Sequence, residues 1–315
     1  MDNFSFYDLQ PKISNFPDEV LAGLSKQQKQ IPPKFFYDEY GSKIFDQICE
    51  LEEYYPTRTE FGILQQHSSD IADQIGENSL IIEYGSGSSQ KICFLLDSLI
   101  KPWAYMPIDI SREHMLSASK TIADKYPNLK VLGVYADYTT EMLLPEYAIS
   151  SVQKKVIFFP GTTIGNLEPE EAIQLLKRSA MIVGSCGGML IGFDMKKDPQ
   201  ILHASYNDSK GVTAAFNINL LTRINRELEA SFDTNTFTHY AFFNPQKSRI
   251  EMHLISLVEQ TVVISDRLFN FLEGESIHTE NSYKFSVQEI ENMSERTGFK
   301  LIRFWTDPKK HFYPG

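Results

Sequence analysis

Residues Leu80-Ile81-Ile82-Glu83-Tyr84-Gly85-Ser86-Gly87-Ser88-Ser89 decide the fold of this 315-residue chain. The apolar run predicts a buried strand, and the glycines after it allow the backbone to turn sharply and to pass close to a ligand. A helix is predicted directly beyond the turn, from Lys91 to Leu99. A strand, a glycine-rich turn and a helix in this order open a Rossmann-like α/β fold.

Short apolar runs continue to alternate with helical patterns downstream of this turn. Helices are predicted from Glu113 to Ala123 and from Glu170 to Val183, the second with Pro169 at its start, as helix N-termini prefer. Strands are predicted at residues 105–109, 131–135, 156–159 and 189–193. This alternation is typical of a parallel sheet with right-handed crossovers.

The alternation of short strands and helices ends after Asp194. The sequence predicts a long helix at 214–232 and two strands that form a hairpin, at 249–258 and 260–264. A capping box, Ser286 to Glu289, then begins a helix that ends at Gly298, and residues 299–306 form a final strand.

We therefore expect two domains, both discontinuous in the sequence. A Rossmann-like core comprises residues 57–195 plus 286–315, and a second domain, placed to bind the substrate, comprises residues 1–56 plus 196–285. Ligands of such folds bind at the carboxyl ends of the parallel strands.

The composition disfavours some classes of binding partner. The net charge of −11 and the pI near 5.2 disfavour nucleic acid and anionic membranes. No stretch approaches the roughly 18 apolar residues of a membrane span, and the N-terminus lacks a signal-peptide pattern. Cys49, Cys93 and Cys186 are interpreted as reduced thiols. We expect a cytoplasmic monomer.

The residues that follow successive strands indicate the cofactor. Gln90 stands where a dinucleotide fingerprint expects its third glycine, which disfavours NAD. Asp109 ends the second strand, where an acid can accept hydrogen bonds from ribose hydroxyls. Asp137, beside Tyr138, follows the third strand, where it can meet an adenine amino group. The pattern favours S-adenosylmethionine, with an NAD-dependent oxidoreductase as the alternative.

Several longer motifs of the chain are specific to one family. The most specific are Tyr54-Tyr55-Pro56-Thr57-Arg58 and Gly161-Thr162-Thr163-Ile164-Gly165-Asn166. Further runs of this kind are Pro33–Asp38, Gly211–Asn217, Ile224–Leu228 and Ile250–Met252. Together they resemble the L-histidine N-alpha-methyltransferases of ergothioneine biosynthesis and their relatives, from about Pro32 to Asp307.

This resemblance implies a class I S-adenosylmethionine-dependent core that trimethylates the α-amino nitrogen of histidine to hercynine, without a metal. It assigns the cofactor to Gly85, Lys91, Asp109, Asp137 and Tyr138. It assigns the amino and carboxylate groups of the substrate to Tyr37, Asn166 and Tyr206, the first two of them catalytic. The imidazole falls to Tyr54, Glu280 and Ser282, and the pocket wall to Thr213 and Met252.

The chemistry of methyl transfer agrees with these roles. A sulfonium leaves as a neutral group, so the enzyme must chiefly position a neutral amine in line with the methyl–sulfur bond. We expect the amine proton to leave through water or a path that includes Tyr37. A buried Glu280 would reject substrates that leave it unpaired, and Ser282 would share its face in a strand. Glu280 with Met252 favours imidazole over indole.

Two positions depart from the family pattern close to the expected pocket, namely Pro160-Gly161 and Asn281. Relatives in the wider family methylate tryptophan-derived amines, so another amino acid or such an amine remains an alternative substrate. A non-catalytic S-adenosylmethionine-binding protein is the remaining alternative. The seven histidines show no metal-ligand spacing, and we interpret them as structural or surface residues.

Overall fold

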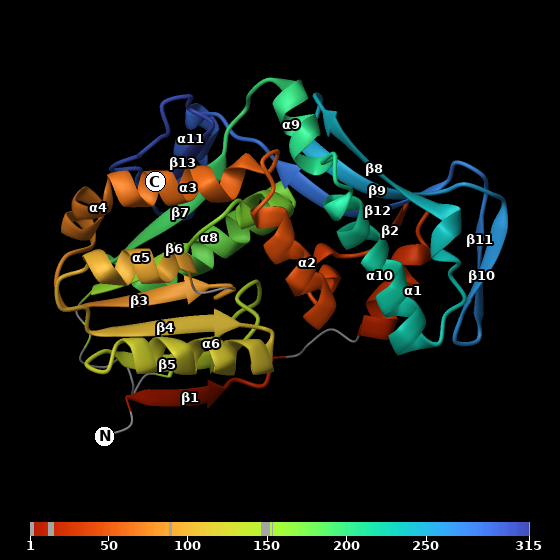
Figure 1. The fold of residues 1–315 in the computed structure, drawn as a ribbon. Helices are drawn as coiled ribbons and strands as arrows, with labels where there is room; N and C mark the ends of the chain where they lie inside the picture. The colour runs from red at the N-terminus through yellow and green to blue at the C-terminus, as the bar shows by residue number, and fades with distance from the viewer. Residues whose placement is uncertain (1–2, 12–15, 88–89, 146–151, 153, 315) are drawn as a thin grey trace. The chain divides into compact units, whose positions relative to one another are not determined.

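The computed structural model describes residues 3–11, 16–87, 90–145, 152 and 154–314 (Figure 1). The chain divides into two compact units. Unit 1 comprises residues 1–13, 58–195 and 285–315, and unit 2 comprises residues 14–57 and 196–284. No helix among the described residues combines the length and the apolar character that crossing a membrane requires.

Unit 1 is built on a seven-stranded sheet of order β1-β5-β4-β3-β6-β7-β13. All neighbouring pairs are parallel except β13 and β7. The order β5-β4-β3-β6-β7 is that of a doubly wound nucleotide-binding sheet, which confirms the expected Rossmann-like α/β core. The strands are β1 (Phe4–Asp8), β3 (Ser79–Tyr84), β4 (Ala104–Asp109), β5 (Lys130–Tyr135), β6 (Lys154–Phe159), β7 (Gly188–Asp194) and β13 (Phe312–Pro314).

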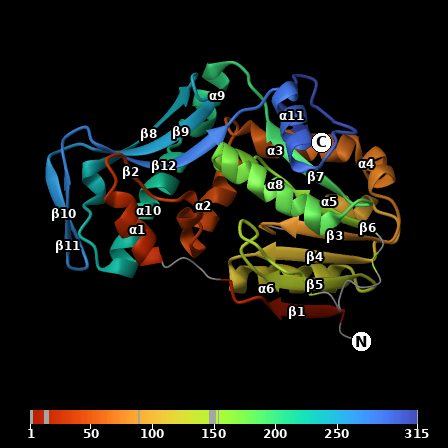
Figure 2. The same cartoon turned by 180° about the vertical axis from the view of Figure 1, so that it is seen from behind.

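Helices cover both faces of this sheet. In Figure 1, α5 lies in front of it, and α8 comes to the front in the reverse view of Figure 2. All residues of β3 are accordingly buried, as in a parallel strand covered on both sides. The helices are α3 (Tyr55–Gln66), α4 (Ser68–Ile75), α5 (Gln90–Ser98), α6 (Arg112–Lys125), η2 (Thr163–Asn166), α8 (Pro169–Val183) and α11 (Val287–Thr297).

Unit 2 contains a four-stranded sheet of order β2-β12-β9-β8 and a separate hairpin of β10 and β11. Helix α10 packs on this sheet, and Phe216, Leu220 and Ile224 of the helix share one apolar core with Met252 and Leu254 of β9. The strands are β2 (Lys29–Gln30), β8 (Phe237–Asn244), β9 (Arg249–Ser256), β10 (Gln260–Ile264), β11 (Arg267–Phe271) and β12 (Ser276–Tyr283). The helices are α1 (Phe16–Leu24), η1 (Pro33–Phe36), α2 (Glu39–Cys49), α9 (Pro199–Tyr206), α10 (Val212–Leu228) and η3 (Thr234–Thr236).

A β-bulge in β12 decides which side chains share a face. His278 pairs with His253 of β9, whereas Glu280 pairs with Met252, so the register shifts between His278 and Glu280. Directly paired residues lie on the same face of a sheet. We call the face that carries Met252, Glu280 and Ser282 the inner face, and the face that carries His253 and His278 the outer face. The extra residue, Thr279, is buried, and its hydroxyl lies 2.8 Å from Asn217 Oδ1 of α10.

Four local predictions differ from the structure. Strand β1 pairs with β5 in unit 1, although residues 1–56 were expected in the substrate-binding domain. Strand β8 was not predicted, and it pairs with β9. The return strand at 260–264 pairs with β11 instead of β9. Residues 299–306 form no strand, and β13 occupies the edge beside β7.

The predicted ends of α8 and α11 are confirmed, whereas α5 and α6 differ from the predicted bounds by one or two residues. Pro169 is the first residue of α8. Ser286 caps α11 in a reciprocal capping box with Glu289, and Gly298 ends this helix with φ +88°.

Candidate active site

The glycine turn after β3 has the backbone that only glycine adopts readily. Gly85 has φ +72° and Gly87 has φ +38°. The Gly85 N–H donates to the Ile108 carbonyl at 2.9 Å, which fixes the turn against β4. A β-carbon at Gly85 would lie 3.9 Å from the Tyr138 ring. Ser88 and Ser89, the rest of the motif, lie outside the described residues.

The two acids predicted to meet the cofactor follow the strands next to β3. Asp109 is the last residue of β4, and its Oδ1 accepts from Ser111 N at 2.8 Å. Asp137 follows β5, and its Oδ1 accepts from Thr139 N at 2.9 Å. Tyr138 stacks on the ring of Tyr84 with centroids 5.1 Å apart and planes at 7°. Gly85, Asp109 and Asp137 therefore stand at the carboxyl ends of three adjacent strands, where α/β sheets bind ligands.

Lys91, the remaining residue predicted to meet the cofactor, is held by a buried acid of α3. Its Nζ lies 2.5 Å from Glu60 Oε2. The other oxygen of Glu60 accepts from Gly161 N at 2.7 Å. Gly161 has φ +78° and begins the turn that leads to Asn166. Glu60 thus joins the helix after the glycine turn to the loop after β6.

Asn166 is the last residue of η2 and is partly buried. The N-cap of the following helix, α8, is Glu168, in a capping box with Glu171. The side chain of Asn166 is therefore not used to cap α8.

A second acid, Glu83, is buried at the end of β3. Burial raises the pKa of Glu83 to about 8, against the opposing effects of a hydrogen bond from Tyr105 and the charge of Lys91. At neutral pH this carboxyl is mostly protonated.

In unit 2, the structure brings four of the predicted substrate-binding residues together. Tyr37, Tyr206 and Glu280 all act electrostatically on Tyr54, whose pKa is raised well above its ordinary value, chiefly by burial. The rings of Tyr54 and Tyr206 meet edge to face at 6.4 Å. Tyr37 follows η1 and packs edge-on against Phe216.

Glu280 lies on the inner face beside Met252 and is only 9% exposed. Burial raises the pKa of its carboxyl to about 7, and the positive charge of Lys284 opposes this rise. Met252 is 2% exposed, so the wall next to the carboxyl is apolar. An apolar wall makes an unpaired carboxylate costly.

Ser282 is held between two donors. Tyr206 donates to Ser282 Oγ at 2.7 Å, and the buried Lys284 donates to the same oxygen at 2.8 Å. A serine hydroxyl accepts two hydrogen bonds and donates one. Because these two contacts use both acceptor positions, the Ser282 proton is the group left for a further partner.

Thr213 lies in the first turn of α10, four residues before Asn217 and hence on the same side of the helix. Its backbone N–H donates to Asp208 Oδ1 at 2.7 Å. Its side chain also hydrogen-bonds to Asp208, and both contacts help to lower the pKa of that carboxyl.

The geometry of these residues agrees with the protein family that nearly the whole chain matches. Residues 16–314 match the family described as histidine-specific methyltransferase, SAM-dependent, where SAM is S-adenosylmethionine. The chain belongs to this family.

Individual members of the family are also similar to this chain in sequence. A histidine N-alpha-methyltransferase of Mycolicibacterium smegmatis is 38% identical over 93% of this chain and 92% of its own length. One of Mycobacterium tuberculosis is 37% identical with the same coverage. The ergothioneine biosynthesis protein 1 of Neurospora crassa is 30% identical over 88% of this chain, which spans 32% of that longer protein.

Three residues that contact the predicted site residues or their neighbours were not predicted from the sequence. Lys284 could have been found, because it stands two residues after Ser282 and so shares its strand face. Glu60 and Asn217 carry no local signal, since each acts on a residue far away in the sequence. Only the fold shows their roles.

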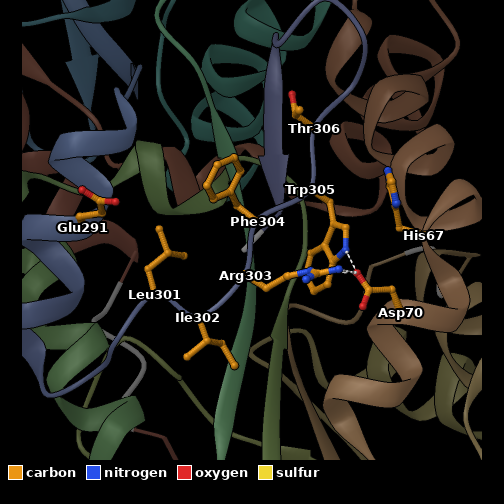
Figure 3. Close-up of a pocket in the computed structure, with 9 residues that line it drawn as sticks. All are labelled: His67, Asp70, Glu291, Leu301, Ile302, Arg303, Phe304, Trp305 and Thr306. Carbon is orange, nitrogen blue, oxygen red and sulfur yellow. Dashed lines mark hydrogen bonds and ion pairs between the residues drawn. The ribbon is translucent and has the colours of Figure 1, made fainter.

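None of these residues lines the cavity of about 520 Å³ that unit 1 contains (Figure 3). Asp70 accepts there from Arg303 Nε at 3.0 Å and from Trp305 Nε1 at 2.7 Å. Leu301, Ile302 and Phe304 form its apolar lining. The carboxylate is already engaged by two donors, and none of the predicted site residues lines the cavity. We therefore do not assign the active site to it.

Proposed function

We propose that this methyltransferase transfers three methyl groups in turn to the α-amino nitrogen of L-histidine and so forms hercynine for ergothioneine biosynthesis. The observation that supports this substrate best is the pair of Glu280 and Ser282 on the inner face of β12. Glu280 offers an acceptor, and Ser282 offers a donor.

An imidazole matches this pair atom for atom. Its N–H would donate to the Glu280 carboxylate, and its other nitrogen would accept from the Ser282 hydroxyl. An indole has an N–H but no second ring nitrogen, so it would leave the Ser282 proton unpaired. Sites built on hydrogen bonds discriminate strongly against analogues that lack a partner.

S-adenosylmethionine would supply the methyl group as an electrophile on a sulfonium, so that one carbon–nitrogen bond forms as the carbon–sulfur bond breaks. Gly85, Asp109 and Asp137 fit this cosubstrate, because left-handed glycines and carboxylates stand at the ends of adjacent strands. We propose that Lys91 and Tyr138 complete its binding. In this proposal unit 1 binds the cosubstrate and unit 2 binds histidine.

The amine must be neutral and correctly oriented when it receives the methyl group. We assign the amino and carboxylate groups of the substrate to Tyr37 and Asn166, the imidazole to Tyr54 with Glu280 and Ser282, and the pocket wall to Thr213 and Met252. The hydroxyl proton of Tyr206 is donated to Ser282, so we propose that Tyr206 acts on the substrate through this serine. An α-amino group has a pKa of about 8, so a modest decrease is sufficient and no strong base is needed. The proton leaves through water or a path that includes Tyr37. Methyl transfer itself uses no metal, and the enzyme acts as a cytoplasmic monomer.

The test is a substrate panel. The chain is incubated with S-adenosylmethionine and each of the twenty amino acids, and the products are measured by mass spectrometry. We expect histidine to gain one, two and finally three methyl groups. Methylation of a different amino acid instead would overturn the assignment of Glu280 and Ser282, while the methyltransferase activity would stand.

Glu280→Gln tests the imidazole contact directly, because it keeps the shape of the side chain and removes its charge. A hydrogen bond to a charged group is worth about 2 kcal/mol, so kcat/KM for histidine should fall roughly 30-fold. Glu259→Gln is the matched control, since Glu259 is exposed between β9 and β10. Equal activities of the two variants would contradict the proposal.

A further inference from the structure

The outer face of the sheet in unit 2 carries a compact group of metal-ligating side chains. Glu251 and His253 of β9 and His278 of β12 each present a ligand atom, and these atoms lie within 4.8 Å of one another. His253 and His278 are directly paired across the strands, with ring centroids 4.8 Å apart. Glu251 precedes His253 by two residues and so shares its face.

Each of the three side chains is oriented by a second partner, as metal ligands usually are. His253 Nδ1 lies 3.2 Å from Ser276 Oγ, and His278 Nε2 lies 3.1 Å from the Glu280 carbonyl oxygen. A carbonyl only accepts, so Nε2 of His278 carries the proton and Nδ1 carries the lone pair. The Asn281 side chain also hydrogen-bonds to His278.

The Glu251 carboxylate is also oriented by hydrogen bonds from neighbouring side chains. Glu251 Oε1 accepts from Arg249 Nε at 2.8 Å and from Asn244 Nδ2 at 3.0 Å. Its other oxygen, Oε2, accepts a hydrogen bond from His253 Nε2 at 3.3 Å. An ion bound between them would replace this proton, and His253 Nδ1 would then donate to Ser276 Oγ.

The donor set suits a cation of the zinc class. Two imidazoles and one carboxylate, with ligand atoms within 4.8 Å of one another, are donors that Zn²⁺ prefers, whereas Ca²⁺ and Mg²⁺ prefer oxygen alone.

We propose that Glu251, His253 and His278 form a binding site for a divalent transition metal of the zinc class, with water completing the coordination. Tetrahedral zinc holds neighbouring donor atoms about 3.4 Å apart, so small side-chain rotations close the site. The charge of Arg249 weakens the affinity without occupying the binding oxygen.

The role of this site is structural. The metal would join β9 to β12 immediately before the bulge at Thr279. Because His278 holds the carbonyl of Glu280, the same bond network fixes the residue that faces the opposite side of the sheet. The site lies on the outer face and Glu280 on the inner face, so the metal takes no part in methyl transfer.

The experiment uses the full chain without an affinity tag, stripped with EDTA and dialysed. Titration with Co²⁺ alone should give one equivalent of bound metal with the visible absorption of a low-coordinate site, and Zn²⁺ should displace it. His253→Gln and His278→Gln should each weaken Zn²⁺ binding roughly 100-fold, since each removes one of three ligands. Zinc should also raise the Tm of the wild-type chain and not that of the variants.

His203→Gln is the matched control, because His203 is exposed on α9 in the same unit. It should bind metal as the wild type does. Circular dichroism checks that all three variants are folded. Failure of the wild type to bind Co²⁺ or Zn²⁺ stoichiometrically at micromolar concentrations would overturn the proposal, as would binding that survives both ligand substitutions.

Discussion

At the scale of single residues, the histidine site that we propose in unit 2 depends on side chains that act through their neighbours. Tyr206 and Lys284 donate to Ser282 and thereby leave the serine proton to point at a ligand. Without one of these donors, the hydroxyl can turn and use its proton elsewhere. The orientation of Ser282 is therefore a property of three residues.

Tyr206→Phe removes one donor and keeps the aromatic ring that meets Tyr54. One neutral hydrogen bond is worth about 1 kcal/mol, so KM for histidine should rise about fivefold while kcat changes little. Steady-state kinetics at saturating S-adenosylmethionine measure both values. Tyr240→Phe, at an exposed outer-face ring, should leave both unchanged. An unaltered KM in Tyr206→Phe would show that Ser282 does not depend on this donor.

The sequence made the residue types of the site visible but not their contacts. Acids after the second and third strands could be predicted, because the ends of parallel strands are marked by apolar runs. The engagement of Lys91 by Glu60 could not, because the two residues belong to different helices. The group of Glu251, His253 and His278 was also invisible, since its histidines lie on separate strands that only pairing brings together.

At the scale of secondary-structure elements, features that neighbouring residues determine were predicted better than features that depend on strand pairing. Helix ends such as those of α8 and α11 are set by nearby residues, and they were predicted well. The bulge residue Thr279, by contrast, donates a hydrogen bond to Asn217, which lies in a helix far away in the sequence. Without the bulge, His278 and Glu280 would share a face, so strict alternation alone gives a wrong arrangement. Strand β1 was missed because its partner, β5, lies more than a hundred residues away.

Ser286→Ala tests the contribution of the capping box to α11. The Ser286 side chain accepts from Glu289 N, and the Glu289 side chain accepts from Ser286 N. Loss of such a cap should lower the free energy of unfolding by about 1 kcal/mol. Urea denaturation followed by tryptophan fluorescence measures this change, because Trp103 and Trp305 both belong to unit 1 with α11.

Ser294→Ala is the control for this helix. Ser294 lies in its last turns, where alanine is at least as favourable as serine, so the free energy of unfolding should change by less than about 0.5 kcal/mol. Equal stabilities of the two variants would mean that the capping box does not stabilise the unit.

At the scale of the whole molecule, the buried carboxyl of Glu83 links folding to pH. Its pKa is about 8 in the folded chain against an ordinary 4.5, mainly because of burial. Between these values the folded chain holds a proton that the unfolded chain has released. The free energy of unfolding therefore falls as pH rises, and it levels off above pH 8.

Other groups with shifted pKa values contribute in unit 2. Burial lowers the pKa values of His239, His253 and His278, so their contributions to stability rise with pH until about one pH unit above 6.5. Glu280, with a pKa raised to about 7, adds a fall that continues to about pH 7. All four residues belong to unit 2, so the effect of Glu83 is measured on the unfolding of unit 1.

We predict that the free energy of unfolding of unit 1 falls by about 2 kcal/mol from pH 6.5 to 8, at about 1.4 kcal/mol per pH unit. Urea denaturation with tryptophan fluorescence, in EDTA to remove metal, measures it. Glu83→Gln should abolish most of this slope, because the amide keeps a partner for the Tyr105 hydroxyl and carries no titratable proton. Glu77→Gln, at an exposed position of the same unit, should keep the slope. A wild-type stability that does not change over this range would mean that Glu83 is already ionised in the folded chain, and that the donors around it outweigh its burial.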